Sequence, residues 1–253
     1  MSVKERRKAL KPLPSENVII KRQSDGLDSV LREEEIIPSI RSRLRHNILT
    51  MPAEIQEASG ILIYGRRIRS LVFTTDLAII KNCDADAVFA VYPFTPQQSI
   101  SGPIIRSAAV PVFTGVGGGI TTGVRTVSLA KDAESQGAFG VVLNAPTSNR
   151  TLRAVSVAVD IPVVITVTGD KADVKDRLRH GASIINVAAG ARTPEIVRLI
   201  EKQFPDVPII ASGGGTPEQI RETIRAGANA ITYTPPSTKE LFAETMEKYR
   251  DIY

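Results

Sequence analysis

The sequence is poor in cysteine, lacks tryptophan and contains no long hydrophobic run. Cys83 is the only cysteine among 253 residues, which excludes an intrachain disulfide and a cysteine-cluster metal site. No apolar stretch approaches the roughly 18–20 residues that a membrane-spanning helix needs. The first residues, MSVKERRKALKPLP, also lack the apolar core of a secretory signal peptide. We therefore expect a cytoplasmic protein with no membrane partner.

A strong excess of one charge is also absent. The chain carries 32 Lys and Arg against 27 Asp and Glu, and the basic residues are scattered among acidic ones rather than gathered in a stripe. This pattern is typical of a surface that attracts small anions and argues against a nucleic-acid partner. The hydrophobic content of 42% is ordinary for a globular protein. The length suits a single eight-stranded α/β barrel.

The first 60 residues differ from the rest. Residues 1–22 are basic, with two prolines, and predict an extended or partly ordered arm. Over residues 33–48, isoleucines and a leucine recur at helical spacing, with Pro38 near the start. The spacing predicts one amphipathic helix. We expect residues 1–60 to form a helical extension that packs on the main domain or lies in the interface of a homo-oligomer.

From residue 70 onward, apolar strands alternate with amphipathic helices. A proline-led strand type alternates with a type that follows Gly-Ala, and each recurs at 44 to 51 residues, the length of two strand-helix units. We predict that residues 61–253 form a (β/α)8 TIM barrel. An open doubly wound sheet is the alternative, but its G-x-G-x-x-G loop is missing after the first strand. The eight predicted strands span 70–74, 87–91, 110–114, 139–143, 161–166, 183–187, 207–211 and 229–233.

A glycine run follows the seventh predicted strand. Gly213, Gly214 and Gly215 precede Thr216, a good N-cap, and Gln219 completes a capping box. The helix that starts here offers unpaired N–H groups and a positive dipole end, and the glycines let a ligand approach the backbone. The pattern predicts a phosphate site, with a plain tight turn as the alternative.

The eighth strand ends in a second hydroxyl-bearing turn. In phosphate-binding barrels the loops after strands seven and eight hold the phosphate, so Thr234 and Ser237 are candidates for the second half of the site. The two prolines between them remove two N–H donors.

The segments ASGGGT, residues 211–216, and AGANA, residues 226–230, resemble the ribulose-phosphate-binding barrel superfamily. That superfamily includes phosphoribosylanthranilate isomerase, thiamine-phosphate synthase, indole-glycerol-phosphate synthase and the keto-deoxy-phosphogluconate aldolases. The resemblance implies a phosphorylated small-molecule ligand and does not identify a member.

Few acids or bases follow the predicted strands, where barrel enzymes place their catalytic groups. Asp76, directly after the first strand, is the best candidate for a general acid or base, and an N-cap role is the equal alternative. Asp170 has the same two roles open to it, with the cap favoured. Asn144 and Asn186, on alternate strands, are candidates to orient a carbonyl or hydroxyl of the substrate.

Other strand-end residues complete a predicted substrate pocket. Gly115–Gly119 forms a mobile lid or a second backbone cradle. No lysine follows a strand, which argues against a Schiff base, and no metal site is predicted, although Asp76 and Asp170 together are able to hold Mg²⁺. The predicted pocket residues are Thr74, Tyr92, Thr114, Gly117, Gly118 and Thr166.

These features favour an isomerase or lyase that transfers a proton on a phosphorylated sugar or related metabolite. The cofactor is open, and an FMN-dependent oxidoreductase with the FMN phosphate in the same loops is one alternative. A barrel that binds a phosphorylated effector without catalysis is the other, because acid and base candidates are few.

Overall fold

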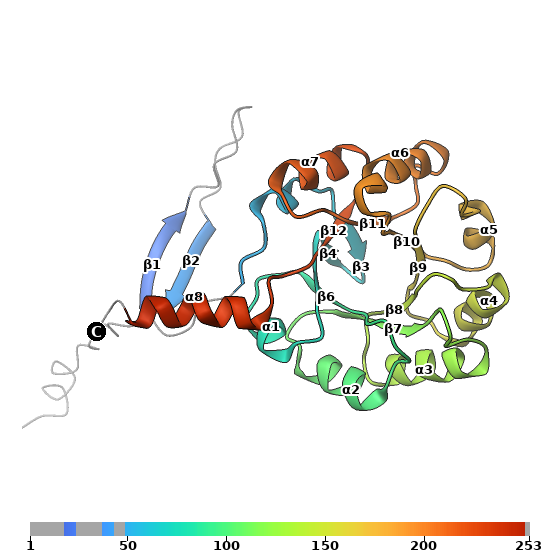
Figure 1. Ribbon diagram of the computed structural model, residues 1–253, viewed down its shortest axis with the longest axis horizontal. Coiled ribbons are helices and arrows are strands. Elements are labelled where there is room, and N and C mark those ends of the chain that lie inside the picture. Colours follow the sequence, from blue (N-terminus) through green and yellow to red (C-terminus); the bar gives the residue numbers. More distant parts are fainter. Residues whose placement is uncertain (1–17, 24–36, 43–48, 251–253) are drawn as a thin grey trace, which may run out of the picture. The chain divides into compact units, whose positions relative to one another are not determined.

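A computed structural model of the chain describes residues 18–23, 37–42 and 49–250 (Figure 1). By its internal contacts the chain divides into two units, residues 1–47 and residues 48–253. Residues 48–60, which the sequence assigned to the extension, belong with the barrel in this division. The role of the N-terminal residues stays a prediction.

The described part of the first unit is a two-stranded antiparallel sheet. Strand β1 (Val18–Gln23) pairs with β2 (Ile37–Ser42). The helix predicted over 33–48 is therefore wrong for residues 37–42, and the rest of that prediction lies outside the described residues. Pro38 is disfavoured inside a helix, whereas in a two-stranded sheet both strands are edges that tolerate it. The β-branched residues of β1 favour a strand and supply the partner for β2.

The second unit contains eight parallel strands that close into a barrel. Each strand pairs with the next along the chain, and β12 pairs with β5 to complete the ring. The TIM barrel predicted from the alternation of strands and helices is confirmed. The strands are β5 (Ser70–Phe73), β6 (Ala87–Ala90), β7 (Val112–Gly117), β8 (Gly140–Leu143), β9 (Val163–Val167), β10 (Ile184–Val187), β11 (Ile209–Ser212) and β12 (Ala230–Tyr233).

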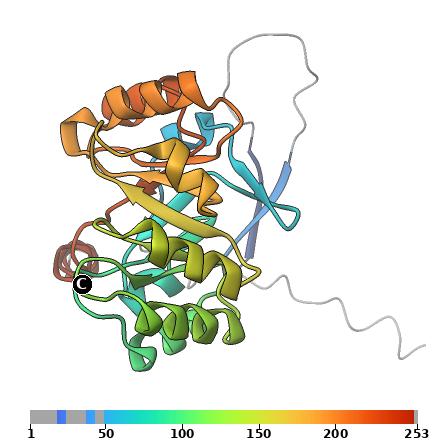
Figure 2. The same ribbon diagram turned by 90° about the vertical axis from the view of Figure 1, so that its right-hand side faces the viewer.

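Helices follow the strands, and all but the last lie around the outside of the ring (Figures 1 and 2). The last helix extends away from the barrel (Figure 1). No helix in the described part of the chain is long and apolar enough to cross a membrane. The helices are α1 (Leu77–Lys81), α2 (Gln98–Ser107), α3 (Val124–Ser135), α4 (Asn149–Ala158), α5 (Val174–Arg179), α6 (Thr193–Gln203), α7 (Pro217–Arg225) and α8 (Thr238–Arg250), with short 3-10 turns η2 (Ala53–Glu57) and η3 (Gly190–Arg192).

All eight predicted strands are present, within three residues of the predicted ends. The largest difference is at β7, which continues to Gly117, so that Gly115 and Gly117 belong to a strand rather than to a loop. Gly115 lies against Val91 of the neighbouring segment and Gly117 against Thr126 of α3. The absence of side chains at these glycines allows that close packing, which sequence alone does not distinguish from loop flexibility.

Two apolar clusters follow from the alternation of side chains along each strand. One fills the inside of the barrel and includes Leu71, Phe89, Phe113, Val142 and Ile184. The other lies between the strands and the helices. Residues two apart on a strand therefore share a face, and this register shows which strand-end residues face the barrel interior.

A short hairpin not predicted from the sequence closes the amino-terminal end of the barrel. Strand β3 (Ile61–Ile63) pairs with β4 (Arg66–Ile68), and Ile61, Ile63 and Ile68 join the interior cluster. At the same end, an Asp86 carboxylate oxygen accepts hydrogen bonds from the backbone N–H groups of Arg69 at 2.8 Å and Ser70 at 3.0 Å. Packing and hydrogen bonds thus close this end of the barrel. The opposite end, formed by the carboxyl ends of the strands, is the open mouth of the barrel.

Candidate active site at the barrel mouth

Two cavities lie at the carboxyl ends of the strands. The central cavity measures about 350 Å³ and contacts residues from the ends of β5, β6 and β8–β12. The second, of about 470 Å³, lies beside it, beneath the loop that follows β7. Tyr92, Pro93, Asn144 and Thr166 line both. The two cavities therefore form one continuous mouth, at the position where barrel enzymes bind their substrates.

A chain of polar side chains crosses the floor of the central cavity. Asn186 Nδ2 donates to Thr166 Oγ1 at 3.1 Å, and Thr166 Oγ1 donates to Asn144 Oδ1 at 3.3 Å. The three residues come from three consecutive strands and share the inward face, because each lies two positions beyond an interior core residue. The structure thus joins both predicted asparagines through a predicted pocket threonine.

Asn186 carries an unsatisfied polar atom. The residue is 5% exposed, and its Oδ1 has no hydrogen-bond partner among the described residues. A buried carbonyl oxygen without a partner costs about 1–3 kcal/mol, and such atoms are uncommon enough to require an explanation. Asn186 also lines the cavity, so an N–H or O–H group bound there is a candidate for the missing partner.

Aromatic side chains form the opposite wall of the mouth. Phe73 and Phe89, with ring centroids 6.2 Å apart, line the central cavity, and Tyr92 packs on Phe94 at 4.6 Å. Tyr92 Oη accepts a hydrogen bond from the backbone N–H of Gln97 at 2.8 Å, so its own O–H proton remains available to a ligand. The sequence predicts Tyr92 as a pocket residue, but not Phe73 or Phe89.

Two further hydroxyl residues of the mouth, Ser212 and Thr232, were also missed. Both line the central cavity. Each lies two residues beyond an interior alanine or isoleucine at the end of its strand, and that inward period is the signal that identifies them once the strands are aligned. Ser212 is the last residue of β11, so the glycine run begins at the rim of this cavity.

The glycine run adopts the predicted turn and capping box. Thr216 caps α7, and Gln219 completes the box. Gly214 has φ +85, and a Cβ there would lie 2.7 Å from Gln219. Gln219 Oε1 already accepts from the N–H groups of Gly215 at 2.9 Å and Thr216 at 3.3 Å. A phosphate at these donors must therefore displace the Gln219 side chain.

The turn after β12 divides into a pocket residue and a capping residue. Thr234 lines the central cavity. Ser237 instead forms a capping pair with Glu240, whose carboxylate accepts from the Ser237 N–H and hydroxyl, both at 2.7 Å. These bonds lower the pKa of Glu240 and keep it ionised. Ser237 is thus hydrogen-bonded at the start of α8 as a capping residue, and its position in the sequence also fits this capping role.

Asp76 acts as the N-cap of α1. Its Oδ1 accepts from the backbone N–H groups of Ala78 at 2.7 Å and Ile79 at 3.4 Å, and its Oδ2 accepts from the hydroxyl of Thr238. The Thr238 hydrogen bond, together with those backbone bonds, lowers the pKa of Asp76 against the opposing effect of burial. Thr74 accepts from the Asp76 N–H. Neither Asp76 nor Thr74 lines the two mouth cavities.

The cap predicted for Asp170 is wrong. Asp173 caps α5 instead, because the turn between β9 and α5 is three residues longer than the pattern suggested. Asp170 is exposed and lies 3.3 Å from Arg192 Nη2, which also pairs with Glu195. Glu195 first, and Asp170 second, raise the pKa of Arg192. Asp170 therefore belongs to a surface ion pair and not to the mouth.

The remaining predicted pocket residues divide between the mouth and the helix layer. Gly117 and Gly118 line the second cavity, and a Cβ on Gly118 would collide with the backbone oxygen of Asn144. Thr114 lines neither cavity. It alternates with the interior residue Phe113, is 1% exposed and has a hydroxyl without a partner among the described residues, on the side of the helix layer.

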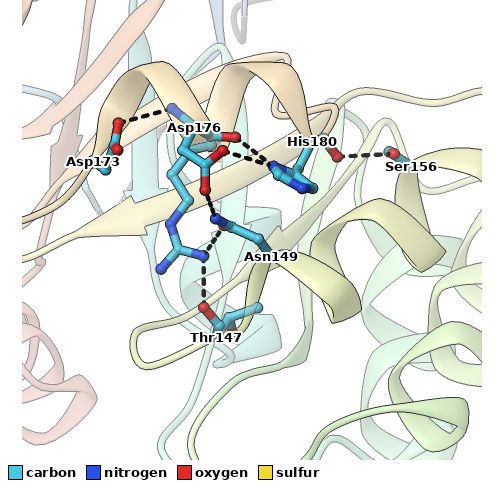
Figure 3. Close-up of polar contacts among 7 residues, drawn as sticks. Thr147, Asn149, Ser156, Asp173, Asp176 and His180 are labelled. Atoms are coloured by element: carbon cyan, nitrogen blue, oxygen red, sulfur yellow. Dashed lines mark hydrogen bonds and ion pairs between the residues drawn. The ribbon is translucent and has the colours of Figure 1, made fainter.

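A second polar network joins α5 to the segment that follows β8 (Figure 3). Arg177 Nη1 donates to the backbone oxygen of Thr147 at 2.6 Å and to Asn149 Oδ1 at 2.5 Å. The Thr147 hydroxyl in turn donates to the backbone oxygen of Asn144 at 2.6 Å. Asn149 also donates to Asp176, which contacts His180. Through Thr147, Arg177 on α5 fixes the segment that carries Asn144.

Within the described residues, no group of three or more His, Cys, Asp or Glu side chains could hold a metal ion. Asp76 and Asp170 also lie in separate networks, with Thr238 and with Arg192. A divalent cation held by carboxylates therefore does not fit the residues of this mouth.

Comparisons with solved structures identify similar barrels. The chain matches phosphonopyruvate hydrolase in complex with oxalate and Mg²⁺ at 14% identity and a TM-score of 0.59, covering 76% of this chain and 84% of that one. The comparison shows a TIM barrel.

Other solved structures lead to the same conclusion. 2,3-dimethylmalate lyase, of the PEP mutase/isocitrate lyase superfamily, matches at 12% identity and a TM-score of 0.57, with coverage of 79% and 84%. Dihydrodipicolinate synthase of Bacillus anthracis matches at 16% and 0.52, with coverage of 72% and 77%. At these identities the likeness extends to the fold alone. No family model and no curated protein matches the sequence.

Proposed function

We propose that this chain is an enzyme of small-molecule metabolism, an isomerase or lyase that acts on a phosphorylated metabolite bound in the barrel mouth. The unpartnered Oδ1 of buried Asn186 at the floor of the cavity, in the part of the chain that the structure describes, carries the proposal. A barrel under selection for stability alone would favour an apolar residue there, because an unsatisfied buried amide weakens the fold.

The phosphate end of the ligand is assigned to the glycine run after β11. Ser212 lines the cavity and Gly213 follows it, so a ligand in the mouth lies next to the N-terminus of α7. The helix dipole favours an anion there. The N–H groups of Gly215 and Thr216 become donors to phosphate when the Gln219 side chain moves away.

Proton transfer in the mouth has one ionisable side chain at hand. Tyr92 is the only ionisable residue among the described residues that line the two cavities, and its O–H is free to donate because its oxygen accepts from Gln97. We assign it the role of proton donor to a substrate oxygen. Asp76, a proton-transfer candidate from its sequence position, retains a catalytic role only if it acts from outside this lining.

A non-catalytic barrel that binds a phosphorylated effector is the second candidate. The scarcity of acid and base groups in the lining favours it. Both candidates require the same ligand site, and turnover separates them. If Tyr92→Phe loses turnover but still binds the ligand, the result supports the enzyme proposal. If the wild type binds phosphorylated metabolites but turns none of them over, the result supports the effector-binding proposal.

The experiment is a thermal-shift screen with phosphorylated metabolites and their dephosphorylated counterparts. A ligand at about 100 times its Kd adds roughly 2.7 kcal/mol of stability, a shift of several degrees for a chain of this length. We expect phosphorylated compounds alone to stabilise the wild type.

The control variants follow from the geometry of the glycine loop. Gly215 has open space at the position that a Cβ would occupy, unlike Gly214, so Gly215→Asp adds a charge without a clash and Gly215→Asn is its neutral match. The response should be lost in the Asp variant and kept in the Asn variant. A screen in which no phosphorylated compound stabilises folded wild type would contradict the proposed function.

A further inference from the structure

The lining of the central cavity separates into two chemically different arcs. From β8 to β12, consecutive strands contribute amide and hydroxyl side chains. From β5 to β6, the lining is aromatic and aliphatic. The polar arc consists of Asn144, Thr166, Asn186, Ser212, Thr232 and Thr234, with Ala188 as its one apolar member, and the apolar arc of Phe73, Phe89, Val91, Tyr92 and Pro93.

Neither arc carries a charge at neutral pH. Among the described residues, no Asp, Glu, Lys, Arg or His lines either mouth cavity. A carboxylate placed among these residues would lose its hydration without a cation to pair with, which is strongly unfavourable. The chemistry of the lining thus selects an uncharged group for the floor of the mouth.

The open hydrogen-bonding positions specify that group more closely. Thr166 is satisfied, because it accepts from Asn186 and donates to Asn144. Asn186 Oδ1 still needs a donor. Among the residues that the structure describes, the Ser212 hydroxyl and the Asn144 amide N–H groups have no acceptor. A ligand with adjacent donor and acceptor oxygens matches this pattern.

We infer that the mouth binds the uncharged hydroxy-carbonyl or polyol body of a sugar phosphate and excludes carboxylate-bearing metabolites. The sugar hydroxyls donate to Asn186 and accept from Asn144 and Ser212. The carbon face of the sugar packs against Phe73 and Phe89. This inference rests on the proposed function, since it leaves the phosphate at the loop after β11.

The ligand chemistry inferred for this mouth differs from that of a solved structure with the same fold. The matched phosphonopyruvate hydrolase structure holds oxalate, a dicarboxylate, together with Mg²⁺. The described residues of this chain offer no cluster for such a cation. A carboxylate therefore has neither a metal nor a basic side chain to bind at this mouth.

The test compares ligands that share a phosphate and differ at one end. Ribose 5-phosphate and ribitol 5-phosphate carry an uncharged body, and 5-phosphoribonate carries a carboxylate in place of the aldehyde. Affinities are measured by titration calorimetry with and without Mg²⁺. We expect the neutral pair to bind at least 10-fold more tightly than 5-phosphoribonate, with no effect of Mg²⁺.

Two variants locate the discrimination in the polar arc. Asn186→Leu removes both the open acceptor and the amide, and should weaken ribitol 5-phosphate at least 10-fold. Ser212→Ala, which removes one hydroxyl and leaves the fold intact, should weaken it about 3–10-fold, the range of one hydrogen bond. Leu62→Ala, at an exposed position of the hairpin at the opposite end of the barrel, serves as the folded control with unchanged affinity.

The outcomes distinguish this inference from the proposed function. If 5-phosphoribonate binds as tightly as ribitol 5-phosphate, or binds only with Mg²⁺, the inference is overturned while the phosphate site stands. Unchanged affinity in both polar-arc variants also overturns it. If none of the three phosphates binds, the proposed function fails and the inference fails with it.

Discussion

The two ends of this barrel differ in packing, since the amino-terminal end is closed and the carboxyl-terminal end is open. At the amino-terminal end, the β3–β4 hairpin buries isoleucines in the interior cluster, and Asp86 accepts two backbone N–H groups. At the mouth, two cavities remain open and a buried amide oxygen lacks a partner among the described residues. Arg69 Nε at the closed end also lacks a partner among the described residues, but Arg69 lines neither mouth cavity, whereas Asn186 lines the central one. This difference supports the proposal that the mouth is the functional end.

The largest effect is expected at the closed end. Ile68 is 2% exposed and packs inside the barrel, so Ile68→Ala leaves a cavity and should lower the free energy of unfolding by about 2–4 kcal/mol. Leu62 in the same hairpin is 73% exposed, and Leu62→Ala should change it by less than about 0.5 kcal/mol. Urea unfolding measures both.

The effect of Ile68→Ala on stability can be compared with its effect on ligand affinity. Ile68→Ala should leave the affinity for ribitol 5-phosphate unchanged, because Ile68 lies at the opposite end of the barrel from the mouth. A stability loss for Ile68→Ala no larger than for Leu62→Ala would mean that the hairpin does not seal the core.

A smaller effect is expected behind the mouth. Arg177 donates to Thr147 and Asn149, and Thr147 holds the backbone of Asn144. Arg177→Met keeps most of the aliphatic stem and removes both bonds, which should cost about 1–3 kcal/mol of stability because the acceptors lose a charged donor. Since Asn144 then loses a fixed position, affinity for the ligand should also fall.

Arg179, on the same helix but with no bond to Thr147 or Asn149, offers the matched control. Arg179→Met should preserve both stability and affinity. If Arg177→Met lowers stability but leaves the affinity of the mouth unchanged, the network supports the fold alone and does not position Asn144.

The barrel could be predicted from sequence because its signals are local and repeated. Apolar runs such as those of β8 and β9, which are buried on both faces, recur with helices between them. The capping box of Thr216 involves only residues within four positions of one another. Asn144 and Asn186 were identifiable because each directly follows the core of a strand. Their link through Thr166 was not, since it joins residues 20 and 22 positions apart.

Other features depended on partners that a sequence does not display. Asp76 takes its place from Thr238, which lies 162 residues away, and Gln219 occupies the donors expected to bind phosphate. Asp170 was mistaken for a cap because Asp173 provides the same chemistry three residues later. The strand β2 was mistaken for a helix because helical spacing of apolar residues outweighed Pro38, and its partner β1 was not identified.

The smallest predicted effect concerns pH and the link between α1 and α8. The Thr238 hydroxyl and the N–H groups of Ala78 and Ile79 lower the pKa of Asp76, while burial opposes them. A carboxyl whose pKa is lower in the folded state stabilises the fold above its ordinary pKa of about 3.9, and loses that contribution as the pH falls through the lowered value. Because Asp76 is partly exposed, water reduces the magnitude.

Thr238→Val tests this link, with Thr238→Ser as the variant that keeps the hydroxyl. At pH 7, Thr238→Val should lower the free energy of unfolding by about 0.5–1 kcal/mol. The deficit should be smaller at pH 2, which lies below the ordinary pKa of an aspartate, whereas Thr238→Ser should follow the wild type throughout. Urea unfolding at both pH values gives the comparison. An equal deficit at pH 7 and pH 2 would show that Thr238 acts through packing, and that the lowered pKa of Asp76 comes from the helix N–H groups alone.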